Sequence, residues 1–180
     1  MLRNTRGGVD GHLRSGVDRV WRIASSLFCR EGLPMIRDVT FLLTQTLSSW
    51  TQIKTGGSFV LSNGNRTATI NNTGATRTYF TKSATVTAGH WYYFSVFVDS
   101  AAANFDKDTG YGDAQVLIYE TANVQAGQQY YAITAADNGK RVGILYQSAI
   151  TGTQAFRVGV GAVGNREAGT LVISDPNVYS

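Results

Sequence analysis

Apolar and polar residues alternate in short runs along most of this chain, with a period of two. The clearest run is residues 91–98, because successive side chains of a strand point to opposite faces. One face is a continuous apolar row of Phe94, Val96 and Val98. The other face carries Trp91, Tyr93, Ser95 and Phe97. This pattern predicts a strand near the centre of a β-sandwich, with the apolar row facing the core.

Similar short runs follow one another from Met35 onward, separated by glycine and asparagine turns. One such turn is the Ser-Asn-Gly-Asn of residues 62–65, which predicts a hairpin. Strands are expected at residues 39–47, 58–61, 67–70, 77–86, 91–98, 114–119, 142–147, 155–160 and 170–174. Residues 130–135 fit either a strand or a turn-rich connection. Short strands with regular turns predict an all-β, antiparallel sandwich or jelly roll over residues 35–180.

The first 34 residues differ from the rest. They hold six arginines, no lysine and three acidic residues, a net charge of +3. Part of this stretch has helical spacing, through Val17, Val20, Trp21, Ala24, Leu27 and Phe28. Residues 1–34 are therefore predicted to be a basic N-terminal arm, helical or disordered. Three interpretations stay open: an arm that docks on a partner, a helix packed on the sandwich, or a start-site artefact with translation from Met35.

Charge and cysteine content exclude some classes of function. Residues 35–180 contain ten basic and nine acidic groups, so the body is nearly neutral and offers no basic surface for nucleic acid. No apolar run reaches the length of a membrane span. The single cysteine, Cys29, excludes an intramolecular disulfide and a multi-cysteine metal site. Neither a nucleic-acid partner nor a membrane partner is expected.

Several segments together resemble a known kind of domain. They are Ala84-Thr-Val-Thr-Ala-Gly with Tyr-Phe-Ser-Val-Phe-Val98, Phe156-Arg-Val-Gly-Val-Gly161, and Gly169-Thr-Leu-Val-Ile-Ser-Asp-Pro176. The pattern resembles a carbohydrate-binding-module-like jelly roll, a kind found in bacteriophage fibres and capsid-decorating proteins. Residues 47–50 and 57–70 are similar to the first strands of such domains, so the resemblance covers about residues 47–179. It implies non-enzymatic attachment.

Catalytic motifs are missing from the sequence. There is no G-x-S-x-G elbow, H-E-x-x-H or P-loop pattern. Residues 159–164 match G-x-G-x-x-G, but too little chain follows for a dinucleotide-binding unit. The glycines of that strand instead predict a close approach by another backbone or by a side chain. Asp99, Glu120 and the acidic loop at 106–113 offer carboxylates, yet nothing pairs them across a cleft. The protein is expected not to be an enzyme, and an unrecognised glycoside hydrolase is the third alternative.

The acidic loop has one other interpretation. Asp106, Asp108 and Asp113 have the oxygen-ligand spacing of a calcium loop, since hard cations prefer carboxylates on a tight glycine turn. The full EF-hand pattern fails, and Asp and Gly are also ordinary turn residues. The loop is either a calcium site or a plain polar connection. No other cofactor is expected.

Aromatic side chains are the candidate binding residues. The body is rich in them, with Trp50, Tyr79, Trp91, Tyr92, Tyr93, Tyr111, Tyr119, Tyr130, Tyr131 and Tyr146. Exposed rings bind the apolar faces of sugars or anchor protein interfaces, whereas core packing is the default role of any one ring. The predicted binding set is Tyr111, Tyr130, Tyr131, Trp91, Tyr93 and Trp50.

Together these features predict a structural attachment protein of a phage particle, located in the virion, and most simply a capsid-decorating or cement protein. Its expected partners are capsid or other virion proteins and further copies of itself, because β edges need covering. The alternative is a glycan-binding module of a phage fibre or a secreted protein.

Overall fold

A computed structural model describes residues 41–43, 46–74, 77–106, 113–120, 129–161 and 167–180. The side chains of Phe41, Leu42, Glu120 and Gln129 are not part of this description. The chain divides after Arg37, and residues 38–180 form one unit. The predicted arm, residues 1–34, lies outside the described residues. Among the described residues no helix is long and apolar enough to cross a membrane.

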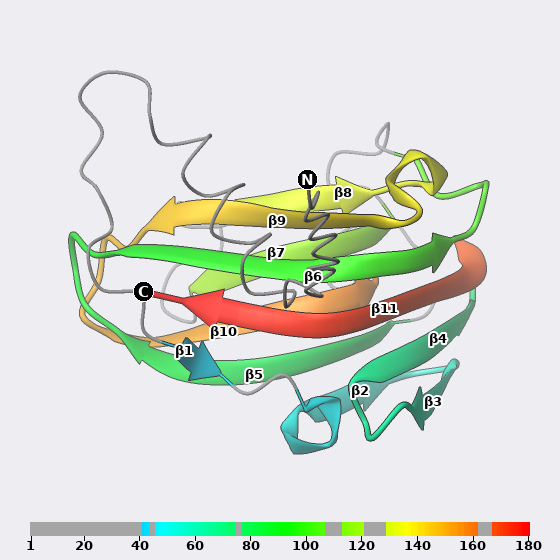
Figure 1. Cartoon of the computed structure of the whole chain (residues 1–180), viewed down its shortest axis with the longest axis horizontal. Coiled ribbons are helices and arrows are strands. Elements are labelled where there is room, and N and C mark those ends of the chain that lie inside the picture. The colour runs from blue at the N-terminus through cyan, green and yellow to red at the C-terminus, as the bar shows by residue number, and fades with distance from the viewer. Residues whose placement is uncertain (1–40, 44–45, 75–76, 107–112, 121–128, 162–166) are drawn as a thin grey trace, which may run out of the picture. The chain divides into compact units, whose positions relative to one another are not determined.

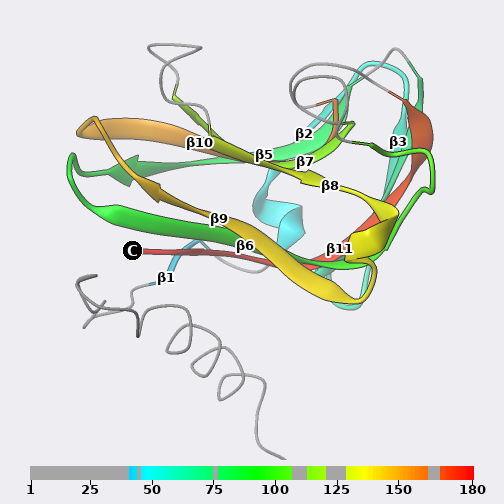
Figure 2. The ribbon, with the colours of Figure 1, turned by 90° about the horizontal axis from the view of Figure 1, so that it is seen from above.

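The described residues form two antiparallel sheets that face one another, as Figures 1 and 2 show from two directions. The first sheet has the strand order β3–β4–β11–β6–β9, and β1 also pairs with β11. Its strands are β1 (Phe41–Leu43), β3 (Ser58–Ser62), β4 (Thr67–Thr73), β6 (Trp91–Ala101), β9 (Lys140–Gln147) and β11 (Ala168–Tyr179). β11 reaches both β4 and β1 because it is the longest strand of the sheet.

The second sheet has the strand order β2–β5–β10–β7–β8. Its strands are β2 (Thr51–Lys54), β5 (Thr78–Val86), β7 (Ala114–Glu120), β8 (Gln129–Ile133) and β10 (Gly152–Val160). Sequence neighbours β5 and β6 lie in different sheets, so the chain crosses repeatedly between the two layers. The all-β antiparallel sandwich predicted from the sequence is confirmed.

The core lies between the sheets and confirms the predicted inward row of β6. Phe94, Val96 and Val98 are all fully buried. The Phe94 ring stacks on Trp50 at 5.9 Å between centroids and meets Phe156 of β10 edge-on at 5.6 Å. These contacts join β6 to the opposite sheet, so β6 holds the two layers together.

The start of the domain differs from the prediction of one strand over residues 39–47. β1 covers Phe41–Leu43, and Leu47–Ser49 form a 3₁₀ helix, η1. The spacing of Leu47 and Trp50 suits one 3₁₀ turn, which lets both side chains enter the core at 0% and 3% exposure. β2 was not predicted, because this edge strand is mostly exposed and has no apolar alternation. The prediction that residues 47–50 belong to a first strand was therefore wrong.

The turn between β3 and β4 was predicted correctly, unlike the start of the domain. The Ser-Asn-Gly-Asn segment connects β3 and β4, as expected, and Asn63, Gly64 and Asn65 all have positive φ. Residues 130–135, which the sequence left open, include most of β8 and the start of the 3₁₀ helix η2 (Ala135–Asp137). Glycine and asparagine adopt positive φ at low cost, which is why this hairpin could be located from sequence.

Candidate functional site

The outward side of the second sheet carries a cationic side chain between aromatic rings. On β10, Phe156 and Val158 point into the core with no exposed surface, so Arg157 between them points outward. In the sheet register Arg157 lies between Thr81 of β5 and Leu117 of β7. Directly paired residues share a face, so all three side chains are on the outer surface of this sheet.

Two tyrosine rings contact the Arg157 guanidinium. Its central carbon lies 3.9 Å from the ring centroid of Tyr119 and 5.4 Å from that of Tyr79. Neither tyrosine is the direct register partner of Arg157, since Tyr119 pairs with Ala155 and Tyr79 with Gly159. Cation–π attraction of this kind contributes about 0.5–2 kcal/mol, depending on desolvation. We refer to Arg157, Tyr79 and Tyr119 as the Arg157 clamp.

Glycine at position 159 is a condition of the clamp. A Cβ atom at Gly159 would lie 2.5 Å from the Cα and 2.7 Å from the Cβ of Tyr79. Gly159 also has φ +147°, a conformation that other residues rarely adopt. The close backbone approach expected from the glycines of this strand is thus confirmed at Gly159, and it is β5 at Tyr79 that approaches.

The clamp lies on an apolar base, and no described residue supplies a counter-charge. Leu117 is fully buried although it faces outward, and it forms a small cluster with Tyr79, Ile53 and Tyr119. The Nε atom of Arg157 is buried without a hydrogen-bond partner. Within the part of the chain that the structure describes, the one ion pair is Arg66 with Asp175, in the other sheet. The donors of Arg157 that remain accessible are therefore its two Nη groups.

The two adjacent tyrosines of β8 have different roles. Tyr130 pairs with Leu117, shares the outer face with the Arg157 clamp and is 40% exposed. Tyr131 points to the opposite side and packs against the core, and its hydroxyl donates a 2.8 Å hydrogen bond to Asp137 of η2. Burial, this hydrogen bond and the Asp137 charge together raise the pKa of Tyr131 to about 12. Tyr130 is thus placed to meet a ligand, whereas Tyr131 secures η2.

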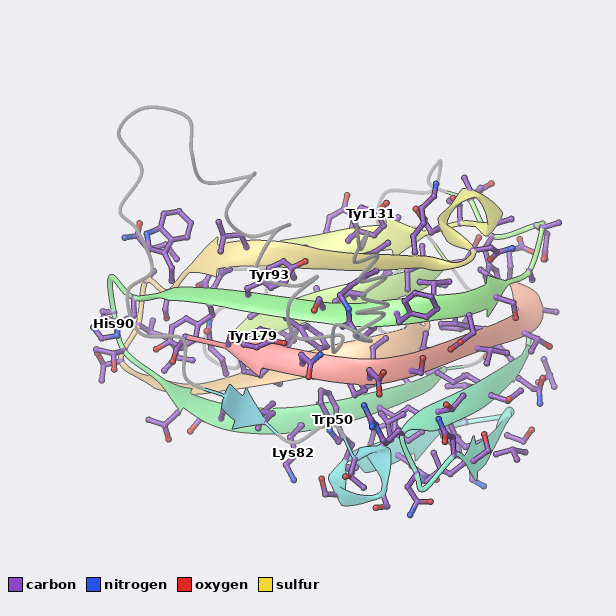
Figure 3. The ribbon with its side chains drawn as sticks, in the orientation of Figure 1. Trp50, Lys82, His90, Tyr93, Tyr131 and Tyr179 are labelled. Carbon is purple, nitrogen blue, oxygen red and sulfur yellow. The ribbon has the colours of Figure 1, made fainter. Side chains whose placement is uncertain are left out.

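Trp91 and Tyr93 lie on the outer face of the first sheet, away from the clamp. Tyr93 stacks on Tyr179 of β11 with centroids 6.3 Å apart, and Figure 3 shows the two rings on neighbouring strands. Burial raises the pKa of both phenols, although the nearby Arg141 charge opposes the shift. Trp91 is 37% exposed. This second surface includes Tyr179 and Arg141, which the sequence analysis did not select.

Arg141 sits beside that stack and ties the first sheet together. Its Nη1 donates to the Ser95 hydroxyl at 3.3 Å and to the Asp175 carbonyl at 3.0 Å. Its hydrogen bonds are thus directed to its own sheet, in contrast to Arg157.

The last two residues of the predicted binding set are Trp50 and Tyr111, and neither is placed on a binding face. Trp50 is 3% exposed and stacks on Phe94, so it is a core residue and presents no ring to a ligand. A large aromatic directly after an apolar 3₁₀ turn is drawn into the core because burying it removes the most apolar surface from water. Tyr111 lies outside the described residues.

Of the three predicted calcium ligands, Asp106 and Asp113 are described by the structure. Asp113 is 1% exposed, and its two carboxylate oxygens accept backbone N–H groups from Asp106 and Glu167, each at 3.2 Å. Asp108 lies outside the described residues. Among those described, no three His, Cys, Asp or Glu side chains gather as a metal site. Asp113 joins two chain segments through hydrogen bonds, and the calcium site stays a prediction.

The Arg157 clamp combines residues from β5, β7 and β10. Tyr79 and Tyr119 were among the aromatics noted in the sequence, but neither was selected, and Arg157 was missed. An arginine in an apolar strand, within Ala-Phe-Arg-Val-Gly-Val, was the available signal, because an unpaired charge at such a position is uncommon.

No family model and no curated protein sequence matches the chain. Similarity is found among solved structures. The enzymatically active domain of tailspike protein 4 of bacteriophage CBA120 superposes with a TM-score of 0.50 and 12% identity, over 74% of this chain and 20% of the tailspike chain. The chain therefore spans about a fifth of the length of that tailspike.

Carbohydrate-binding modules are also similar in structure. TmCBM61, solved with β-1,4-galactotriose, gives a TM-score of 0.49 at 10% identity, over 74% of this chain and 90% of the module. The module CBM6cm-2 of Cellvibrio mixtus lichenase 5A, solved with cellotriose, gives 0.45 at 12%, over 78% and 98%. At these identities the likeness concerns the fold alone. The predicted resemblance to a carbohydrate-binding-module-like jelly roll, of a kind found in phage virion proteins, is confirmed at that level.

Proposed function

We propose that this protein is a non-catalytic glycan-binding module, and that the outer face of its second sheet receives the glycan. The observation that supports this is the Arg157 clamp, with the exposed ring of Tyr130 on the same face. Sugars present apolar C–H faces that pack on aromatic rings, and hydroxyl groups that accept hydrogen bonds from a guanidinium.

The spacing on this face suits an extended ligand. Tyr130 and Arg157 lie in one register row, separated by Leu117. Neighbouring strands are about 4.8 Å apart, so their backbones are about 10 Å from each other. One sugar ring over Tyr130 and another beside the Arg157 clamp would fit this separation. A chain of sugars running across β8, β7 and β10 is the geometry that we propose.

A glycan array tests this function directly. The full chain is expected to bind at least one defined glycan, and Tyr130→Ala is expected to weaken that binding about tenfold, because one stacked ring is lost. Val60→Ala is the matched control, since Val60 is 56% exposed on the other sheet. If the folded protein binds no glycan, or if the control weakens binding equally, the proposal fails.

A second candidate is attachment to a phage particle, in the capsid-decorating or cement role expected from the sequence. The observation in its favour is an exposed apolar pair on the first sheet, Trp91 at 37% and Leu145 at 38% exposure. They are diagonal neighbours, because Leu145 pairs with Tyr93, two positions along β6 from Trp91. Exposed aromatic and aliphatic side chains of this kind anchor protein interfaces.

Co-sedimentation with phage particles separates the two candidates. A cement protein binds particles that lack it, and Leu145→Glu is expected to abolish that binding while glycan binding persists. Lys140→Glu on the same strand is the control, because Lys140 is exposed. Among the described residues its side chain donates a hydrogen bond only to the Ala136 carbonyl. If the folded protein does not co-sediment with the particles, the attachment role is contradicted.

A further inference from the structure

The Arg157 clamp also indicates which class of glycan is bound. We propose that the Arg157 guanidinium recognises a carboxylate of the glycan, so that the ligand contains sugar acids such as hexuronic acids. This inference rests on the proposed glycan-binding function and specifies the chemistry of the same site.

The charge of Arg157 is the first argument. A guanidinium remains protonated at any pH at which proteins are folded. Partly removing this charge from water is costly, and an anionic partner at the accessible Nη groups offsets that cost. The side chain of Arg157 makes no hydrogen bond or ion pair with any described residue, and its Nε atom is buried. Within the described ranges this positive charge has no anionic partner, and we assign that role to the ligand.

The surroundings of the charge are the second argument. Tyr79 and Tyr119 contact the guanidinium through their rings, which attract a cation but accept no hydrogen bond from its Nη groups. Leu117, its direct neighbour on β7, is fully buried. An apolar base of this kind lowers the local dielectric constant and strengthens a hydrogen bond to an anion. The side chain is also held in place, so less conformational entropy is lost on binding.

The shape of the donor is the third argument, and it favours a carboxylate. The Nε atom of Arg157 is buried, so the accessible edge of the guanidinium is its two Nη groups. Their parallel, coplanar N–H donors match the two oxygens of a carboxylate. A neutral hydroxyl accepts one of these hydrogen bonds and leaves the charge unpaired. Thr81 is the direct register partner of Arg157 on β5 and lies on the same face of the sheet.

A matched pair of ligands tests the inference without any mutation. Isothermal titration calorimetry compares an oligogalacturonate with the same oligosaccharide after its carboxylates have been reduced to alcohols. The full chain is expected to bind the acid form about tenfold more tightly or better, because only that form makes the charged bidentate contact. Raising the salt concentration should narrow the difference, since the interaction is ionic.

Variants of Arg157 then test whether this side chain causes the preference for the acid form of the ligand. Arg157→Lys keeps the charge but loses the planar pair of donors, and it is expected to remove most of the preference for the acid form. Lys54→Gln is the matched control for Arg157→Gln, because Lys54 is exposed on β2 of the same sheet and follows Ile53, so it points to the opposite side. Thermal unfolding confirms that each variant is folded.

The possible outcomes are distinct. Equal binding of both ligands, or a preference that Arg157→Gln leaves intact, overturns the carboxylate inference while the glycan-binding function stands. Preference for a sulfated glycan over both ligands also overturns it. If folded protein binds neither ligand and no other glycan on an array, the proposed function fails together with the inference. A preference for the acid form that is lost in both Arg157 variants and kept in Lys54→Gln supports the proposal.

Discussion

Tyr119 faces Ala155 in the sheet register, yet its ring contacts the guanidinium of Arg157, two positions further along β10, at 3.9 Å. The contact is diagonal because a long arginine side chain reaches past its direct partner to the neighbouring ring. The small side chain of Ala155 leaves the ring room to lean toward Arg157. Arg157 is thereby held on the outer face of the sheet by Tyr119, which is far from it in the sequence.

The aromatic ring of Tyr119 is expected to hold Arg157 in place. Tyr119→Leu should lower the free energy of unfolding by about 1 kcal/mol, because the cation–π contact is lost. Tyr119→Phe keeps the ring and should come close to the wild type. Urea unfolding measures both variants, and combining each with Arg157→Met gives the coupling between the two side chains. Equal losses in the Leu and Phe variants would show that the ring–cation contact contributes nothing.

Gly159 is expected to tolerate no side chain. Gly159→Ala places a Cβ atom 2.5 Å from the Cα of Tyr79 and forces alanine to φ +147°. Strain and displacement of β5 should lower the free energy of unfolding by about 3 kcal/mol or more. Gly152→Ala on the same strand is the control, because its nearest neighbour, the Cδ1 of Ile150, lies at 3.9 Å. Similar stability of the two variants in urea would contradict the close approach.

The Asp113 carboxylate is expected to hold two chain segments together. Asp113→Asn leaves one acceptor oxygen for the N–H groups of Asp106 and Glu167, and directs an NH₂ group at the other. The free energy of unfolding should fall by about 2 kcal/mol, as for charge-assisted hydrogen bonds. Hydrogen exchange of these two amides should accelerate. The exposed Asp99→Asn is the control, and unchanged exchange in Asp113→Asn would refute this role.

Tyr131 is expected to make stability fall at high pH. Its pKa is raised to about 12 in the folded state, against about 10 in an unfolded chain. The stabilisation is therefore complete below about pH 10 and is lost as the pH rises through about 12. The wild type should lose stability over this window, and Tyr131→Phe should lose less of it.

The same variant also loses the hydrogen bond to Asp137, so at neutral pH it should be less stable by about 1 kcal/mol. Tyr93 and Tyr179, whose pKa values are also raised, titrate in both proteins and cancel in the comparison. Urea unfolding at a series of pH values gives the difference curve. A flat curve across the alkaline range would show that Tyr131 is not coupled to folding.

Much of the fold could be predicted because its determinants are local. The inward row of Phe94, Val96 and Val98 follows from alternation along one strand. The turn between β3 and β4 follows from the low cost of positive φ at asparagine and glycine. The 3₁₀ turn at Leu47–Ser49 and the edge strand β2 were missed, since short elements contain too few residues to show a period.

The binding face was harder to predict because it depends on strand order. Tyr79, Tyr119 and Arg157 belong to β5, β7 and β10, and they meet because β10 lies between the other two strands. The roles of Tyr130 and Tyr131 also depend on strand order. The sequence shows that the two side chains point to opposite faces of the strand, but it does not show which of them faces the core. By itself, the sequence determined an antiparallel sandwich and the inward face of β6, since both arise from local alternation and turn chemistry. Only the tertiary structure decided that Trp50 is buried in the core and that Arg157 is held between two rings, without an ion pair to any residue in the described part of the chain. Both depend on contacts between distant segments.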